Sequence, residues 1–288
     1  MAEKNLKSMY RTMQEDPFPA KMEIAFINDE NSRQIMVYEK ATWTIDGEKK
    51  GLRYGENPDQ PAALYRLVNG NLVLGEVHSI NPGLCLASDI ELLQSGKHPG
   101  KINVTDADAA LNILKYFTDG PCVVIVKHNN PCGVACGETL AEAYTKALAG
   151  DRIAAFGGAV ALNGEVDRET AEMISESYVE VVAAPGYAPG SFDILSGRKN
   201  LRIMRIENIR RLSEFENSRV VEYKSLIDGG IAVQWSYVPA ARKPEDLLPA
   251  EVTYKGATHK VKRAPSKSEL EDMIFGWLVE SGVTSNSV

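Results

Sequence analysis

The sequence predicts the α/β fold class with a largely parallel sheet. Two observations support this prediction. Between residues 107 and 184, segments with the helical spacing of apolar residues alternate with short apolar segments. The short segments are continuously apolar, which is typical of strands that helices cover on both faces. Because ligands of such sheets bind beyond the carboxyl ends of the strands, we expect the functional site there.

The first part of the chain is the least regular. Residues 1–22 are polar and carry Pro17 and Pro19, which predicts a leading arm. Short apolar patches in residues 22–38 and 41–43 have no clean period, and they predict strands joined by loops.

A loop of distinctive composition follows at residues 51–60. It is punctuated by glycine and proline, carries Arg53, Tyr54 and Asn57, and precedes a strand-like segment at residues 63–65. Arginine, tyrosine and asparagine together could bind a ligand, although the same composition suits a solvated turn. The residues alone leave both interpretations open.

Helices and strands then begin to alternate. Apolar residues on one helical face predict a helix over residues 107–117, with Asp106 as its N-cap. Gly120 and Pro121 end this helix. The apolar run at residues 122–126 predicts a buried strand directly after it.

The alternation continues along the chain. A second amphipathic helix is expected over residues 140–148, ended by Gly150. We expect a strand at residues 153–162, a helix at residues 167–178 that Asp167 opens, and a strand at residues 179–184.

Two more strands, residues 201–206 and 229–234, precede a charged stretch that contains prolines. This change of composition predicts a domain boundary near residue 240. Beyond the boundary, Ser266 to Glu269 fits a capping box, and the apolar helical face behind it predicts a helix at residues 270–278.

The sequence therefore divides into three parts. Residues 1–22 form the N-terminal arm, residues 23–240 the first α/β subdomain, and residues 241–288 the beginning of a second, truncated subdomain. The last part is too short to bury a core of its own. We expect either that it belongs to a longer polypeptide, or that it packs on the first subdomain or on another subunit.

Composition excludes several function classes. The 288-residue chain is 44% hydrophobic, enough for a substantial core, and its formal charge of −7 disfavours nucleic acid as a partner. No apolar run is long enough for a membrane span, and the opening residues lack the apolar core of a signal peptide. We therefore expect a cytoplasmic protein with reduced thiols and a small-molecule partner.

The strand at residues 122–126 runs directly into Lys127 and His128. Neighbouring strand residues point to opposite faces, so these two side chains can share a site only if the chain turns there. We expect residues 129–131 to supply the turn and Gly133 to permit the reversal. The lysine could then hold an anion and the histidine accept a proton, or the two could be a surface pair.

Metal and thiol chemistry are less favoured. His128, Cys132 and Cys136 are zinc-ligand types, but zinc deaminases use Pro-Cys-x-x-Cys with a His-x-Glu. Here the cysteine spacing is one residue too long, and no His-x-Glu occurs. No other histidine is placed to activate Cys132, and no Walker or dinucleotide loop is present.

Phe156 and Gly157 follow in the next predicted strand. Phe156 could stack on a ligand, and Gly157 could let the ligand approach the backbone closely. Alternatively, the glycine could form a flexible bulge.

Several short motifs, each weak alone, resemble the blocks of one family in one order. They are Arg53-Tyr54-Gly55-x-Asn57-Pro58-x-Gln60, Pro99-Gly100-x-Ile102-Asn103-x-x-Asp106-Ala107, Lys127-His128-x-x-Pro131-x-Gly133-x-Ala135, Phe156-Gly157, Ala184-Pro185-Gly186-Tyr187 and Ser285-Asn286-Ser287. In this order they resemble the AICAR transformylase domain of the bifunctional purine biosynthesis protein family.

The resemblance implies an enzyme of de novo purine biosynthesis. It would transfer a formyl group from the cosubstrate 10-formyltetrahydrofolate to the 5-amine of AICAR (5-aminoimidazole-4-carboxamide ribonucleotide), with no metal required. By resemblance, His128 is the general base, Lys127 stabilises the transition state, and Asn286 orients the histidine. The implied substrate-binding residues are Arg53, which would contact the phosphate, together with Tyr54, Asn103, Phe156, Gly157 and Glu180.

The resemblance further implies a cytidine-deaminase-like three-layer fold without zinc, and active sites that lie across a homodimer interface. Three departures from the family stand out. Asp59 replaces the histidine of the family's loop, the cyclohydrolase domain has no room, and the family continues well beyond Asn286. The alternative function is therefore a catalytically incomplete, AICAR-type nucleotide-binding subunit that needs a partner chain.

Overall fold

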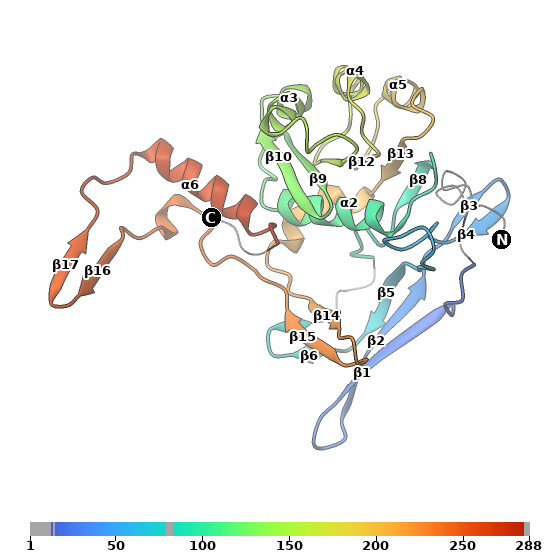
Figure 1. Cartoon of the computed structure of the whole chain (residues 1–288), viewed down its shortest axis with the longest axis horizontal. Helices are drawn as coiled ribbons and strands as arrows, with labels where there is room; N and C mark the ends of the chain where they lie inside the picture. Colours follow the sequence, from blue (N-terminus) through green and yellow to red (C-terminus); the bar gives the residue numbers. More distant parts are fainter. Residues whose placement is uncertain (1–12, 14, 79–82, 285–288) are drawn as a thin grey trace, which may run out of the picture.

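The computed structural model describes residues 13, 15–78 and 83–284. At its centre is a six-stranded sheet with the strand order β10-β9-β11-β12-β13-β8 (Figure 1). These strands are β8 (Glu91–Gln94), β9 (Cys122–Lys127), β10 (Asn130–Cys136), β11 (Ala159–Leu162), β12 (Val181–Ala184) and β13 (Arg202–Arg205).

Helices cover both faces of this sheet, which gives three layers (Figure 1). Alternate residues of β9 enter two separate cores, because successive strand side chains point to opposite faces. Val124 and Val126 pack with residues of α2 and η1, whereas Val123 and Ile125 pack with residues of α3, α4 and α5. The helices are α2 (Lys101–Leu114), α3 (Leu140–Gly150), α4 (Arg168–Glu176), α5 (Ser191–Ser196) and the 3-10 helix η1 (Glu207–Phe215).

The α/β class is confirmed, but the sheet is mixed rather than largely parallel. Strand β12 is parallel to β11 and to β13, whereas the pairs β10–β9, β9–β11 and β13–β8 are antiparallel. The sequence predicts a turn at residues 129–131, whereas residues 130–136 form the strand β10. Its Pro131 lies on the edge strand of the sheet, beside a register shift, where a missing N–H is tolerated. Since β10 reverses the chain before α3, β11 runs parallel to β10 and antiparallel to β9.

The helix boundaries were predicted with mixed success. Asp167 caps α4 as expected, because its side chain accepts the N–H of Thr170 at 2.8 Å. Helix α2, however, begins at Lys101, with Gly100 as its N-cap, rather than at residue 107. The apolar residues in the first turns of α2 do not have helical spacing, so the sequence does not predict that the helix begins at Lys101. Asp106 is therefore a buried residue inside the helix and not its N-cap.

The remaining elements flank the central sheet. The predicted capping box is confirmed at Ser266 and Glu269, where it opens helix α6. Figure 1 shows the hairpin β16–β17 and α6 extending to one side of the sheet. No described helix is long and apolar enough to cross a bilayer. The elements are β1 (Lys21–Ile27), β2 (Arg33–Lys40) and β5 (Tyr65–Gly70) in one antiparallel sheet, the hairpins β3–β4 (Trp43–Ile45, Glu48–Lys50), β6–β7 (Val73–Leu74, Val77–His78), β14–β15 (Val221–Ser225, Ile231–Trp235) and β16–β17 (Glu251–Tyr254, Ala257–Lys260), the 3-10 helix η2 (Pro244–Asp246), and α6 (Lys267–Glu280).

A buried lysine follows α2 and gives a testable stability effect. Lys115 is 8% exposed and lines a cavity of about 530 Å³ on the outer side of the helix. Burial lowers the pKa of its ammonium from 10.5 to about 8, although the charge of Asp108 opposes this shift. Folding therefore disfavours the charged lysine, because the unfolded state binds the proton more tightly.

We predict that Lys115→Met raises the free energy of unfolding by about 2 kcal/mol near pH 7. The wild type gains stability as the pH rises from about 8 to 10.5, so the difference between the two proteins shrinks over this window. Urea unfolding at both ends of the window measures it. The exposed Lys267→Met is the control and should change stability by less than about 0.5 kcal/mol. An equal gain at both pH values would show that charge burial is not the cause.

Candidate functional site

A two-residue hairpin turn lies at the centre of the candidate site. Strand β9 ends at Lys127 and pairs there with Asn130, the first residue of β10. The intervening His128 and Asn129 have φ angles of 54° and 62°, the positive values that a type I′ turn requires. The turn therefore comes one residue earlier than predicted, and Gly133 lies within β10 instead of reversing the chain.

Asp106 of α2 holds this turn. Its Oδ1 accepts the backbone N–H of Asn129 at 2.8 Å. Burial raises the pKa of the Asp106 carboxyl, while the N–H groups of Asn129 and His128 act in the opposite direction. The carboxylate thus fixes the turn to the helix, and His128 is placed by a packed contact rather than by a free loop.

The segment before β11 forms the next wall of the site. Lys127 Nζ donates to the carbonyl oxygen of Phe156 at 2.7 Å. Gly157 has a φ of 76°, a backbone conformation that residues with a side chain rarely adopt. Its N–H donates to the carbonyl oxygen of Tyr178 at 2.8 Å. Phe156 is 62% exposed, and its ring lies 4.8 Å from that of Tyr178. An aromatic face is therefore available to a planar ligand.

A charged network forms the opposite wall. Glu180 Oε2 accepts from Asn103 Nδ2 at 3.3 Å and from Arg202 Nη1 at 3.2 Å. Arg202 is 1% exposed; burial lowers the pKa of its guanidinium, and Glu180 opposes that shift. The same guanidinium donates to the carbonyl of His98 at 3.3 Å. Glu180 is therefore held rigidly by α2 on one side and β13 on the other.

These walls line one open cavity of about 200 Å³. The structure brings most of the predicted site residues together in it. Its lining comprises the predicted Asn103, Lys127, His128, Phe156, Gly157 and Glu180, together with Ile102, Asp106 and Tyr178.

Sequence reasoning missed Asp106, Tyr178 and Arg202 as parts of this site. Arg202 left a signal that could have been used, because it is a charged residue at the start of a strand whose two central residues are apolar. A buried charge in a strand needs a partner of opposite charge. Here the partner is Glu180, which lies directly before the neighbouring strand β12. Tyr178 left no comparable signal.

Arg53 and Tyr54 lie outside the lining of this cavity. Arg53 is 5% exposed and donates to the carbonyl of Lys97 at 2.7 Å and to the Tyr54 hydroxyl at 2.8 Å. Its Nε is buried without a hydrogen-bond partner among the described residues. The loop is nevertheless docked on the same helix, since Lys101 donates its N–H to the Tyr54 carbonyl at 2.9 Å. The solvated-turn interpretation of this loop is therefore wrong at these two residues.

Asn286 lies outside the described residues. The described chain approaches the turn through Thr284, whose N–H donates to Asn130 Oδ1 at 3.2 Å. Within the described part of the chain, no group of three or more His, Cys, Asp or Glu side chains is arranged to hold a metal ion.

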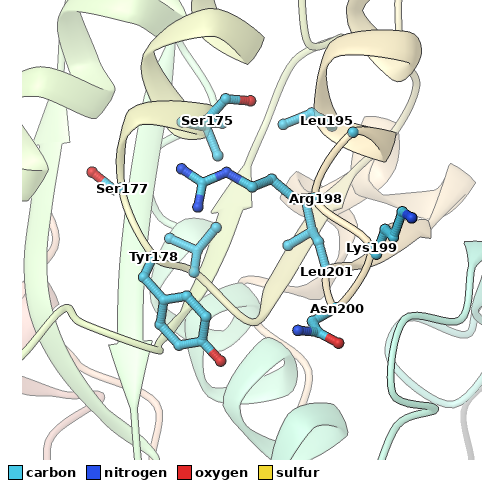
Figure 2. Close-up of a pocket in the computed structure, with 11 residues that line it drawn as sticks. Ser175, Ser177, Tyr178, Leu195, Arg198, Lys199, Asn200 and Leu201 are labelled. Atoms are coloured by element: carbon cyan, nitrogen blue, oxygen red, sulfur yellow. The ribbon is translucent and has the colours of Figure 1, made fainter.

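Another pocket, of about 210 Å³, shares Tyr178 in its lining with the first cavity (Figure 2). It is formed between the end of α4 and the loop after α5. Figure 2 shows the Arg198 side chain extending across it toward Ser175 and Ser177, while Lys199 points away. None of the predicted site residues lines this pocket.

The first cavity combines groups that suit chemistry on a planar, polar ligand. The imidazole of His128 can accept or donate a proton, and the ammonium of Lys127 can stabilise negative charge. The exposed ring of Phe156 can stack on a heterocycle, and Glu180 can accept hydrogen bonds from amino groups. A base, a cation and an orienting carboxylate thus surround one small space.

Comparison with known proteins places this chain in a family. The chain matches the family model described as AICARFT/IMPCHase bienzyme over residues 18–288. Three similar curated proteins are each named bifunctional purine biosynthesis protein PurH. The protein from Listeria innocua is 36% identical over 250 residues, which are 87% of this chain and 43% of the relative. That from Sorangium cellulosum is 39% identical over 240 residues, 82% of this chain and 40% of the relative.

The relative from Bacillus thuringiensis is 34% identical over 265 residues, which are 92% of this chain and 46% of that protein. The chain therefore spans less than half the length of these curated relatives. The family model nevertheless covers nearly all of the chain. The chain belongs to the AICARFT/IMPCHase family.

Proposed function

We propose that this chain carries the formyl-transfer site of its family, which uses 10-formyltetrahydrofolate to formylate the 5-amine of AICAR in purine biosynthesis. The observation that carries the proposal is the cavity in which Lys127 and His128 meet Asn103, Phe156 and Glu180. Family membership supports a role in purine biosynthesis, and the cavity contains side chains of the types that formyl transfer would need.

The reaction requires a base because the attacking amine is a poor nucleophile, with its lone pair delocalised into the ring and the carboxamide. His128 would take a proton from this amine as its nitrogen bonds to the formyl carbon. The ammonium of Lys127 would stabilise the negative charge that develops on the formyl oxygen. As the bond between the formyl carbon and the folate nitrogen breaks, the protonated His128 would give its proton to that nitrogen, and tetrahydrofolate leaves. Asn286 is proposed to orient His128.

The nucleotide would lie with its heterocycle in the cavity. Phe156 offers the stacking face, and Gly157 leaves room beside it. Glu180 and Asn103 provide hydrogen bonds to the amino and carboxamide groups. Arg53 and Tyr54 are assigned to the phosphate; the unpartnered Nε of the buried Arg53 supports this, because a guanidinium fork suits a phosphate.

A direct assay tests the reaction. The purified chain is mixed with AICAR and 10-formyltetrahydrofolate, and tetrahydrofolate release is followed by absorbance while calorimetry follows nucleotide binding. Turnover together with binding is the expected result. Absence of both would contradict the proposal.

A second candidate is a nucleotide-binding subunit that needs a partner chain to turn over. One observation favours it. The cavity of about 200 Å³ is smaller than the roughly 300–1,000 Å³ that encloses a typical ligand. Binding without turnover would support this candidate, and added partner chain should then restore activity.

Assembly and location are part of the same proposal. We propose that residues 241–288 begin a second, similar subdomain with the cytidine-deaminase-like fold. A second copy or a partner subunit would complete the site in the cytoplasm, where its nucleotide and folate substrates would be supplied.

The phosphate assignment gives a further prediction. Arg53→Ala should weaken AICAR binding about 10- to 100-fold, because a charge-assisted hydrogen bond is lost. Calorimetry measures the affinity, and a circular dichroism spectrum confirms the fold of the variant. Arg198→Ala, in the pocket of Figure 2, is the matched control and should bind like the wild type. A larger loss of AICAR affinity in Arg198→Ala than in Arg53→Ala would indicate that the nucleotide binds in the pocket of Figure 2 instead.

A further inference from the structure

We propose that Cys122 and Cys136 are a modification site, at which peroxide converts the two thiols into a reversible cross-strand disulfide. The two cysteines lie at the open end of the β9–β10 hairpin, opposite the turn that carries His128. Both are free thiols in the structure. The proposed cross-link is separate from the formyl-transfer reaction and does not depend on it.

Strand register places the two side chains against one another. Cys122 and Cys136 are direct partners in the antiparallel ladder. Because successive side chains alternate while direct partners share a face, both point toward the α2 side of the sheet.

The backbone hydrogen bonds show which kind of pair this is. Cys122 directs its N–H and its carbonyl toward Asn163, at 2.9 and 3.3 Å, rather than toward Cys136. The next residues outward are hydrogen-bonded, since Gly137 donates its N–H to the Pro121 carbonyl at 3.0 Å. The cysteines therefore occupy a non-hydrogen-bonded pair, in which Cα atoms are about 4.5 Å apart. This spacing lies within the range that disulfides span.

Exposure assigns different roles to the two thiols. Cys136 lies on the edge strand β10 and is exposed, whereas Cys122 is fully buried beneath it. A hydrogen bond from the Cys122 thiol lowers the pKa of Cys136 to about 7, helped by the charge of Lys146. The same hydrogen bond and burial raise the pKa of Cys122. Cys136 is thus the attacking thiolate and Cys122 the resolving thiol.

The oxidation balances with one equivalent of hydrogen peroxide. The Cys136 thiolate attacks a peroxide oxygen, so that an S–O bond forms, the O–O bond breaks, and hydroxide leaves and is protonated to water. The product is a sulfenic acid on Cys136. The Cys122 sulfur then attacks this sulfenic sulfur; the S–S bond forms, the S–O bond breaks, and the departing hydroxide takes the Cys122 proton as a second water. Two thiols lose two electrons, and the peroxide gains them.

The other two cysteines are not placed to compete. Cys132 belongs to the same strand but packs in the core on the opposite face of the sheet, and burial raises the pKa of its thiol. Cys85 is buried in a different part of the chain, and burial also raises its pKa. Oxidation should therefore be selective for the Cys122–Cys136 pair.

The test is peptide mapping of the whole chain after treatment with one equivalent of hydrogen peroxide. Remaining thiols are alkylated, and the protein is digested with trypsin without reduction. Cleavage after Lys115, Lys127 and Lys146 separates Cys122 from Cys136, so a disulfide joins two otherwise independent peptides. Because Cys132 shares the second peptide with Cys136, Cys132→Ser identifies the linked sulfur.

We expect the linked peptides in the wild type and in Cys132→Ser, their loss in Cys136→Ser, and their release by dithiothreitol. The exposed position of Cys136 makes its serine variant a mild one for folding. Linked peptides that persist in Cys136→Ser, a disulfide only between two chains, or an oxidised Cys136 beside an alkylated Cys122 would each overturn the proposal.

Discussion

Replacing His128 by alanine should slow formyl transfer by about 10³-fold while AICAR affinity changes little. The proposed role of the imidazole is to take a proton in the transition state, so its loss affects kcat more than binding. The remaining walls of the cavity, formed by Asn103, Phe156 and Glu180, are unchanged in this variant and, on the proposed function, would still hold the heterocycle. Steady-state rates and calorimetric titration measure the two effects separately.

A second variant at residue 128 separates the loss of the base from strain in the backbone. His128 has a φ of 54°, which alanine tolerates less well than asparagine does. His128→Asn therefore removes the base and keeps a residue suited to the turn. We expect the same loss of rate in both variants, with unfolding free energies closer to the wild type for asparagine. Near wild-type turnover in His128→Asn would show that another group is the base.

Replacing Gly133 by alanine should destabilise the protein by about 3 kcal/mol or more. A Cβ atom at this position would lie 1.8 Å from the carbonyl oxygen of Ala147 in α3, and the next two nearest atoms are also backbone atoms of Ala147. Either α3 or the β9–β10 hairpin must move. Because the hairpin presents Lys127 and His128, nucleotide binding should weaken in the folded fraction as well.

Urea unfolding measures this effect, with Gly120→Ala as the matched control. A Cβ atom at Gly120 meets no heavy atom within 4 Å, and its φ is not in the left-handed region. The control should therefore change the unfolding free energy by less than about 0.5 kcal/mol. Equal stabilities of the two variants would mean that α3 does not contact β10 as described.

Local sequence signals predicted those parts of the fold that rest on local chemistry. Asp167 and Ser266 cap their helices, since each side chain meets a nearby N–H. The continuous apolar run of β9 correctly predicted a strand covered on both faces. The direction of the strands could not be predicted from local signals. It depends on whether residues 130–136 form a loop or an antiparallel strand. Pro131 and Gly133 suggested a break, whereas an edge position and the close approach of α3 account for them.

The candidate site was predictable to a similar extent. An adjacent lysine and histidine at a strand end were recognisable, and the structure places them in one cavity. The contacts that hold them come from residues distant in sequence. Asp106 meets the turn only after α2 has packed on the sheet, and Arg202 meets Glu180 only because β12 and β13 are neighbours. Such pairings depend on tertiary packing, which a single sequence does not encode locally.

Hydrogen–deuterium exchange with and without AICAR tests the central claim most directly, namely that the nucleotide binds at the turn of Lys127 and His128. Slower exchange is expected in residues 100–106, 127–130 and 156–158, which line or support the cavity. Residues 195–201, beside the pocket of Figure 2, should be unaffected. Protection confined to residues 195–201, or no protection at saturating nucleotide, would contradict the account.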